Sequence, residues 1–283
     1  IALWAGSAGI HRNRNGEIHL IHFRDCVAGC CCGLALASEF SAGIAVCGIL
    51  LLFIIENPKR VFSLAVGMTP ALSLIPVYNW VCFGTPLAFA YHHQAVFTEM
   101  HTGFFGINRF PDARSAYHML FGVQQGLFVW SPVLLLALVG YGQMRRTPKE
   151  LFLVTYWVPL LQVVAISAYF LPRAGGTLGP RLLSSVLPLM ALPVVLGIAR
   201  FPRTGLMLTA ISVLLTTFAT VIDICIDPNI ENPLLHYYVP TFLAQKFSPN
   251  LGSVLGLPGY WSLLPMFLII GFGIGFTWRD LSA

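Results

Sequence analysis

The stretch LLSSVLPLMALPVVLGIA at residues 182–199 contains no charged side chain and lies between Arg181 and Arg200. A helix that crosses a bilayer needs about 20 mainly apolar residues, so this stretch predicts a transmembrane helix. Seven further apolar stretches predict helices of the same kind. They are residues 25–38, 41–55, 61–83, 126–140, 151–170, 205–224 and 260–278. We therefore expect an all-α fold, a polytopic transmembrane bundle of about seven or eight membrane segments.

The composition supports this class. Of the 283 residues, 57% are hydrophobic and 10% are charged, and the mean hydropathy is +0.77. Soluble domains have about 45–50% apolar and about 25% charged residues. A soluble enzyme and a nucleic-acid partner are thereby excluded. The seven cysteines lie mostly in apolar stretches and lack paired spacing, so we interpret them as packing residues rather than as a disulfide framework or a metal site.

Basic residues predict which side of the membrane each connector occupies. If every apolar stretch crosses the membrane, eleven of the 16 basic residues lie on one side and five on the other. Because cytoplasmic loops carry the excess of Lys and Arg, we expect the first side to be cytoplasmic. The eleven are Arg12, Arg14, Arg24, Lys59, Arg60, Arg145, Arg146, Lys149, Arg200, Arg203 and Arg279, and the five are Arg109, Arg114, Arg173, Arg181 and Lys246.

The long connectors then belong to the exoplasmic face. They cover about residues 84–125, 171–181 and 225–259, and two of them are rich in aromatic residues and proline. Long connectors in compact proteins are usually functional or disordered, and we expect these to carry short interfacial helices. We treat residues 1–283 as one transmembrane domain. Because residues 1–10 are apolar but too short to span, we expect them to be the tail of a helix and the chain to be an N-terminally truncated portion.

The segment LPRAGGTLGPRLLSSVLP at residues 171–188 is the first candidate site. Arg173 and Arg181 lie on a glycine-rich turn that leads into a membrane helix, on the side where arginine is scarce. Arginine binds phosphate oxygens in a fork, and a helix N-terminus favours an anion. A lipid phosphate or pyrophosphate headgroup fits this position. The alternative is that both arginines extend to ordinary headgroups as interfacial anchors.

A second polar set lies between residues 83 and 118. Tyr91 and His92 are its candidates for contact with a sugar or a headgroup, and the alternative is a solvated loop. The spacing of its histidines does not predict a dedicated metal site. The remaining polar residues of this set are His93, Glu99, His101, Arg109, Asp112, Arg114 and His118.

Glu39 is the third candidate, a carboxylate at the turn between the stretches 25–38 and 41–55, which could form a tight helical hairpin or include one interfacial helix. An acid near the membrane is a functional candidate, although at a turn it can be solvated. Asp223 has a similar position at a helix end. Asp25 and Glu56 lie at cytoplasmic ends beside basic residues, and we expect both to be solvated.

Three motifs together resemble a known family. FGTPLAFAYHH at residues 83–93, GLFVWSPVLLLALVG at 126–140 and GGTLGPRLLSSVLPLMALPV at 175–194 are similar to the C-terminal part of bacterial polytopic membrane glycosyltransferases of the C superfamily. The nearest groups are the protein O-mannosyltransferases and the aminoarabinose transferases. The resemblance covers about residues 24–278 in the order and spacing of elements.

The resemblance implies a multi-pass enzyme of the bacterial cytoplasmic (inner) membrane, which transfers a sugar from a polyprenyl-phosphate donor outside the cytoplasm, in the cell envelope. It implies a donor-phosphate role for Arg181 and for Arg173. It also implies that the catalytic base is an aspartate in a first exoplasmic loop, which does not lie in these residues, so no catalytic residue is assigned. Glu39 could serve as an accessory acid or as a ligand to a divalent cation, and Tyr91 with His92 could contact the sugar or the acceptor.

Two other functions stay open. One is a non-catalytic membrane subunit, whose helices and loops pack against partners in a larger membrane complex. The other is a transporter, for which the sequence offers helix-breaking prolines but no ionisable residue beside them at mid-membrane depth.

Overall fold

The computed structural model describes residues 23–88, 93, 95, 107, 109–144, 147–169, 171, 177, 179–227 and 230–282. In that part of the chain every regular element is a helix. Two isolated β-bridges accompany the helices, one from Ile107 to Tyr169 and one from Thr177 to Cys225. The expected all-α fold is confirmed.

The first half of the described chain contains α2 (Phe23–Ser38), η2 (Phe40–Ala42), α3 (Gly43–Glu56), α4 (Pro58–Leu72), α5 (Leu74–Phe83), α6 (Ala113–Phe121), α7 (Leu127–Trp130), η5 (Pro132–Leu135) and α8 (Leu136–Gln143). The second half contains α9 (Lys149–Ser167), η7 (Arg181–Val186), α10 (Leu187–Arg200), α11 (Pro202–Ile222), η8 (Leu234–Tyr238), α12 (Val239–Leu243), α13 (Leu251–Val254), η9 (Gly259–Leu263) and α14 (Leu264–Ser282).

Five helical segments of the described chain are long and apolar enough to cross a membrane, which makes this a multi-pass membrane protein. They are Pro58–Phe83, Lys149–Ser167, Arg181–Arg200, Pro202–Ile222 and Gly259–Phe276. The other three expected segments are helical but shorter, with α2 at 16 residues and two apolar helices at Phe40–Glu56 and Pro132–Gln143. The count of seven or eight spans stays a prediction.

Local signals explain where the helices begin and end. The Asn57 side chain accepts a hydrogen bond from the Lys59 amide at 3.1 Å, and Pro58 occupies the first turn of α4. This is the usual arrangement for a helix start, since proline lacks the amide that would be unpaired there. α5 ends at Gly84, whose φ of 75° is left-handed, a conformation that glycine adopts without strain.

Close approach of α2 and α4 depends on glycine and on a buried ion pair. A side chain at Gly29 or Gly67 would collide with the backbone of the facing helix, as in small-residue interfaces of membrane helices. At one end of the contact, Arg60 Nε donates to Asp25 Oδ2 at 2.9 Å and Arg60 Nη2 donates to Asp25 Oδ1 at 2.6 Å. Asp25 is only 1% exposed, so its expected solvation is wrong, whereas Glu56 is exposed as expected.

The central contact lies between α3, α9 and η7. Ala45 and Leu52 from α3, Val154 and Val158 from α9, and Leu183 from η7 belong to one buried cluster. Gly48 in α3 faces Val158 so closely that a side chain could not be added without displacing it. This contact brings the turn that precedes α3 close to the start of η7.

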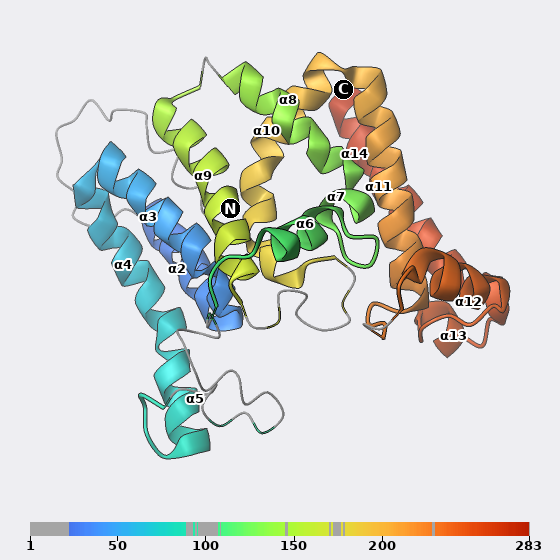
Figure 1. Ribbon diagram of the computed structural model, residues 1–283, viewed down its shortest axis with the longest axis horizontal. Coiled ribbons are helices and arrows are strands. Elements are labelled where there is room, and N and C mark those ends of the chain that lie inside the picture. The colour runs from blue at the N-terminus through green and yellow to red at the C-terminus, as the bar shows by residue number, and fades with distance from the viewer. Residues whose placement is uncertain are drawn as a thin grey trace.

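Figure 1 shows that the helix junctions gather at two ends of the molecule. The α3–α4, α8–α9 and α10–α11 junctions lie together at the top, and we call this side the basic end. The α2–α3 turn, α6 and the α12–α13 region lie toward the opposite side, which we call the loop end. This alternation is the one that the distribution of basic residues predicts.

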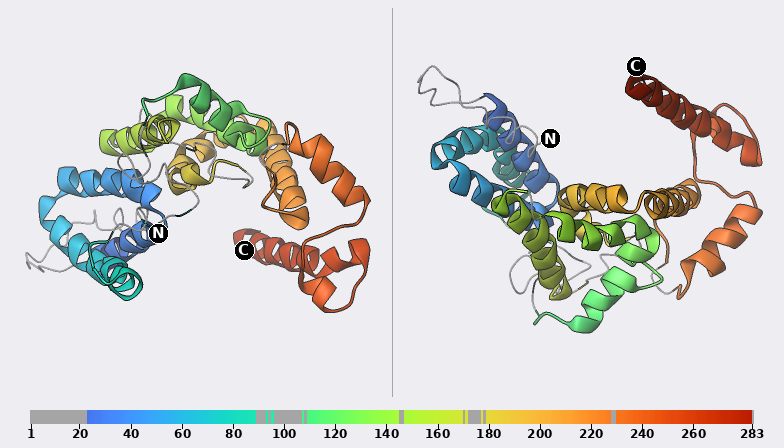
Figure 2. Two further views of the ribbon diagram at one scale, coloured as in Figure 1. Left: turned by 60° about the horizontal axis from the view of Figure 1, so that its bottom comes forward. Right: turned by 90° about the horizontal axis from the view of Figure 1, so that it is seen from above.

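The helices form an open arc, with α2–α5 at one end and the C-terminal helices at the other (Figure 2). α14 packs against α13 and η9, and only 11% of the apolar stretch Gly259–Phe276, which covers η9 and most of α14, is buried inside the protein. Most of α14 is therefore available to lipid.

Candidate functional site

Glu39 lies at the turn between α2 and η2. Its backbone is extended, with φ −153° and ψ 115°, and its amide donates to the carbonyl of Ala35 at 3.0 Å. The chain turns here as expected. At this corner α2 packs mainly on α4 rather than on α3, and one buried cluster contains residues of all three helices. The Glu39 carboxylate is partly exposed at this corner.

Arg181 begins η7, directly after Gly179 and Pro180. Gly179 has φ 71°, which explains why glycine precedes the proline, since other residues are strained in this conformation. The carbonyl of Pro180 accepts a hydrogen bond from the Leu183 amide at 2.8 Å. The Arg181 side chain is 58% exposed, and its Nη2 lies 3.9 Å from Oε2 of Glu39.

Gln162 holds these two segments together. It lies in the middle of α9 and is fully buried. Its Nε2 donates to the carbonyl of Ser41, just after the Glu39 turn, and to the carbonyl of Leu182, just after Arg181, each at 2.9 Å. Sequence reasoning missed Gln162, although an amide inside the apolar stretch 151–170 is the signal that could have revealed it.

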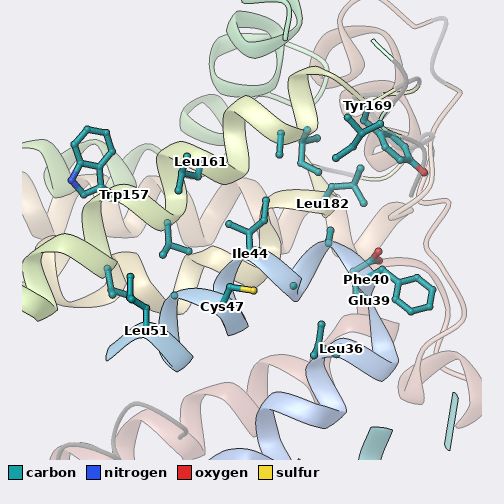
Figure 3. Close-up of a pocket in the computed structure, with 18 of the residues that line it drawn as sticks. Leu36, Glu39, Phe40, Ile44, Cys47, Leu51, Trp157, Leu161, Tyr169 and Leu182 are labelled. Carbon is teal, nitrogen blue, oxygen red and sulfur yellow. The ribbon is translucent and has the colours of Figure 1, made fainter. Parts of the chain in front are cut away.

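An apolar groove of about 710 Å³ runs between α3 and α9 (Figure 3). Glu39, Phe40 and Tyr169 lie at one end of it, and Leu51 and Trp157 lie toward the other. Among the described residues that line the groove, Glu39 is the charged one. The lining also includes Leu36, Ser41, Gly43, Ile44, Cys47, Gly48, Ile107, Leu153, Val154, Val158, Leu161, Ala165, Ile166 and Leu182.

A second, smaller cavity of about 300 Å³ has a mixed lining, with a larger polar share than the groove, and we call it the polar cavity. His118, Gln124, Gln125 and Glu231 contribute imidazole, amide and carboxylate groups, and Pro180 forms part of the wall. Met119, Gly122 and Val123 complete the lining. Because Pro180 lines the polar cavity and Leu182 lines the apolar groove, Arg181 belongs to a segment that separates the two.

Of the five predicted site residues, the structure brings two close together, Glu39 and Arg181. Arg173, Tyr91 and His92 lie outside the described residues. The neighbouring His93 is described, and its ring stacks on Phe83 with centroids 4.4 Å apart. His118 lines the polar cavity, whereas Glu231 of the same cavity was not singled out from the sequence.

Asp112 and Asp223 have structural roles. Asp112 caps α6 by accepting from the Ser115 amide and hydroxyl, each at 2.8 Å, and these bonds lower the pKa of Asp112. Asp223 Oδ1 accepts from the Cys225 amide at 2.9 Å, and its carbonyl accepts from the Tyr238 hydroxyl at 3.0 Å. Burial and the nearby Asp223 raise the pKa of Tyr238, so this tyrosine stays neutral and anchors the loop after α11.

A divalent cation would need more ligands than this corner offers. Among the described residues, no three His, Cys, Asp or Glu side chains gather closely enough to hold a metal ion. The Arg181 guanidinium beside Glu39 also repels a cation at this carboxylate.

Comparison with protein-family models, curated proteins and solved structures finds no match to this chain.

Proposed function

We propose that this protein is a membrane glycosyltransferase of the C-superfamily type, which takes a sugar from a polyprenyl-phosphate donor on the exoplasmic side of a bacterial cytoplasmic membrane. The observation that carries the proposal is the position of Arg181 beside Glu39, which lines one end of the apolar groove. A lipid phosphate has the matching two-part chemistry, an apolar tail and an anionic head.

The groove suits the tail. Its walls are aliphatic and aromatic, and its size falls in the range of about 300–1,000 Å³ that is typical of ligand sites. Leu51, Trp157 and Leu161 on its walls are each about half exposed. In a membrane these residues face lipid, so a polyprenyl chain can enter sideways from the bilayer without crossing water.

Arg181 suits the phosphate. An ion pair at 3.9 Å between partly exposed side chains contributes only about 0–1 kcal/mol. A phosphate, with more charge and several acceptor oxygens, competes well with Glu39 for the guanidinium. We propose Arg173 as a second phosphate-binding residue, and Tyr91 with His92 as contacts to the sugar or the acceptor.

The proposed step is an inverting transfer. The acceptor oxygen forms a bond to the anomeric carbon, the bond from that carbon to the phosphate oxygen breaks, and a carboxylate takes the acceptor proton. Negative charge grows on the departing polyprenyl phosphate, and Arg181 stabilises it. Glu39 acts here as an accessory acid that pairs weakly with the Arg181 guanidinium when no donor is bound.

The test is transfer of radiolabel from polyprenyl-phosphate sugars in membranes that contain the full-length protein. We expect Arg181→Ala to abolish transfer and Arg181→Lys to retain part of it, because lysine keeps the charge but not the fork. Arg203→Ala is the matched control, since Arg203 is an exposed arginine in α11 near the basic end. Unchanged transfer in Arg181→Ala would contradict the assigned role.

A non-catalytic membrane subunit is the alternative. The large apolar surface of α14, with Phe272 77% exposed, would then pack against partner helices. Absence of transfer from every donor, with the full-length protein folded and inserted, would favour this alternative.

A further inference from the structure

The polar cavity lies directly beside the proposed phosphate site. Pro180 is part of its wall, Arg181 follows, and Leu182 is already in the wall of the apolar groove. A polyprenyl-phosphate donor with its tail in the groove and its phosphate on Arg181 therefore has the group attached to the phosphate next to the polar cavity.

The chemistry of the cavity differs from that of the groove. Gln124 and Gln125 offer amides, His118 an imidazole and Glu231 a carboxylate. These groups both donate and accept hydrogen bonds, as the hydroxyl groups of a sugar require.

The cavity is built from segments far apart in the chain, and hydrogen bonds hold them together. Gln124 Nε2 donates to the Ile230 carbonyl at 2.8 Å, which joins the segment after α6 to the segment that carries Glu231. Trp130 Nε1 lies 3.3 Å from the Val123 carbonyl and 3.1 Å from the Gln124 carbonyl. The Trp130 ring packs on Tyr238 with centroids 5.6 Å apart. The cavity is thus formed before a ligand arrives, which lowers the entropic cost of binding.

From this juxtaposition we propose that the polar cavity is the binding site for a single hydroxyl-rich ring, the sugar of the lipid-linked donor, with His118 and Glu231 as its specificity-determining residues. The inference rests on the proposed function. At about 300 Å³ the cavity lies at the lower limit for small-molecule sites, so it accepts one ring rather than an oligosaccharide.

Binding measurements without turnover test the inference. The full-length protein in lipid nanodiscs is titrated with polyprenyl phosphate, polyprenyl-phosphate mannose and polyprenyl-phosphate aminoarabinose. We expect at least one sugar-bearing lipid to bind roughly tenfold more tightly than the bare phosphate, a difference of about 1.4 kcal/mol. Glu231→Gln and His118→Ala should each reduce this preference and leave the affinity for the bare phosphate unchanged.

Two further variants are measured in the same way: Arg181→Ala tests the phosphate contact, and Glu150→Gln is a control. Arg181→Ala should weaken all three lipids together, because it removes the phosphate contact. Glu150→Gln, a partly exposed carboxylate in the first turn of α9, is the matched control and should change nothing. Glu231 is exposed, so its amide variant keeps the fold, and an unchanged thermal unfolding midpoint verifies this.

Each outcome decides between the two proposals. If the bare phosphate binds through Arg181 but neither sugar adds affinity, or if Glu231→Gln weakens all three lipids equally, the sugar site is wrong while the proposed function survives. If no lipid phosphate binds, the proposed function fails and the sugar site fails with it.

Discussion

The guanidinium of Arg181 and the carboxylate of Glu39 lie 3.9 Å apart, one at the start of η7 and the other between α2 and α3. Neither side chain alone determines this position, because both are partly exposed and their pairing is weak. The backbone beneath them does so. Gln162 donates one hydrogen bond to each segment, so the spacing of the two charges is determined inside the bundle.

Gln162→Leu should therefore damage both stability and binding. The carbonyls of Ser41 and Leu182 each lose a buried donor, and we expect a loss of about 1–3 kcal/mol in the free energy of unfolding. We also expect weaker binding of polyprenyl phosphate, because Arg181 is released from its position. Thermal unfolding and lipid titration in nanodiscs measure the two effects. Gln143→Leu, an exposed glutamine at the end of α8, is the control, and equal behaviour of the two variants would disprove the positioning role.

The helices could be predicted from the sequence because apolar length is a local property. The stretch 182–199 lies within η7 and α10, and 205–224 overlaps nearly all of α11. The candidate roles of Glu39 and Arg181 followed from their positions at helix ends. Their proximity could not be predicted, since it depends on the packing of α3 against α9 and η7, which no local pattern specifies.

Side chains whose surroundings come from distant segments of the chain were predicted least well. Asp25 stands beside Arg24 in the sequence, which indicates a solvated carboxylate, yet it is buried against Arg60 of α4. Glu231 was missed for the same reason. The hydrogen bond from Gln124 to the carbonyl of Ile230 holds the Glu231 segment at the cavity wall near His118.

The apolar groove can be blocked without disturbing the core. Cys47 is an exposed residue on its wall, so Cys47→Trp fills the groove from the outside. We expect the affinity for polyprenyl phosphate to fall by roughly tenfold or more, about 1.4 kcal/mol, with an unchanged thermal unfolding midpoint. Cys82→Trp is the matched control, because Cys82 is also exposed but lies in α5 away from the groove. Equal affinity in both variants would mean that the tail binds elsewhere.

Removing one partner of the buried pair of Asp25 and Arg60 should destabilise the fold strongly, whereas replacing both with apolar residues should not. Arg60→Met leaves the Asp25 carboxylate buried without its bidentate partner, and we expect a loss of about 3–5 kcal/mol. The double variant Asp25→Leu with Arg60→Met should regain most of this stability, because no charge is then left buried. Denaturant unfolding in detergent micelles provides the comparison. Lys59→Met, at an exposed neighbouring position, should change stability by no more than about 0.5 kcal/mol.

The N-terminal cap of α6 should make this region sensitive to acid. Hydrogen bonds from Ser115 and Arg114 lower the pKa of Asp112 below its ordinary value of 3.8. A carboxylate with a lowered pKa stabilises the folded state fully above its ordinary pKa, and this contribution is lost as the pH falls through the lowered value. The protection factors of the α6 amides, which are corrected for the intrinsic pH dependence of exchange, should therefore fall below about pH 4. Asp112→Asn keeps a good cap without a titrating group, so it should remove the pH dependence. Ser115→Ala should instead raise the pKa of Asp112 and shift the transition to higher pH. An identical pH profile of α6 protection in the wild type and in Asp112→Asn would show that the charge of the cap does not control the stability of α6.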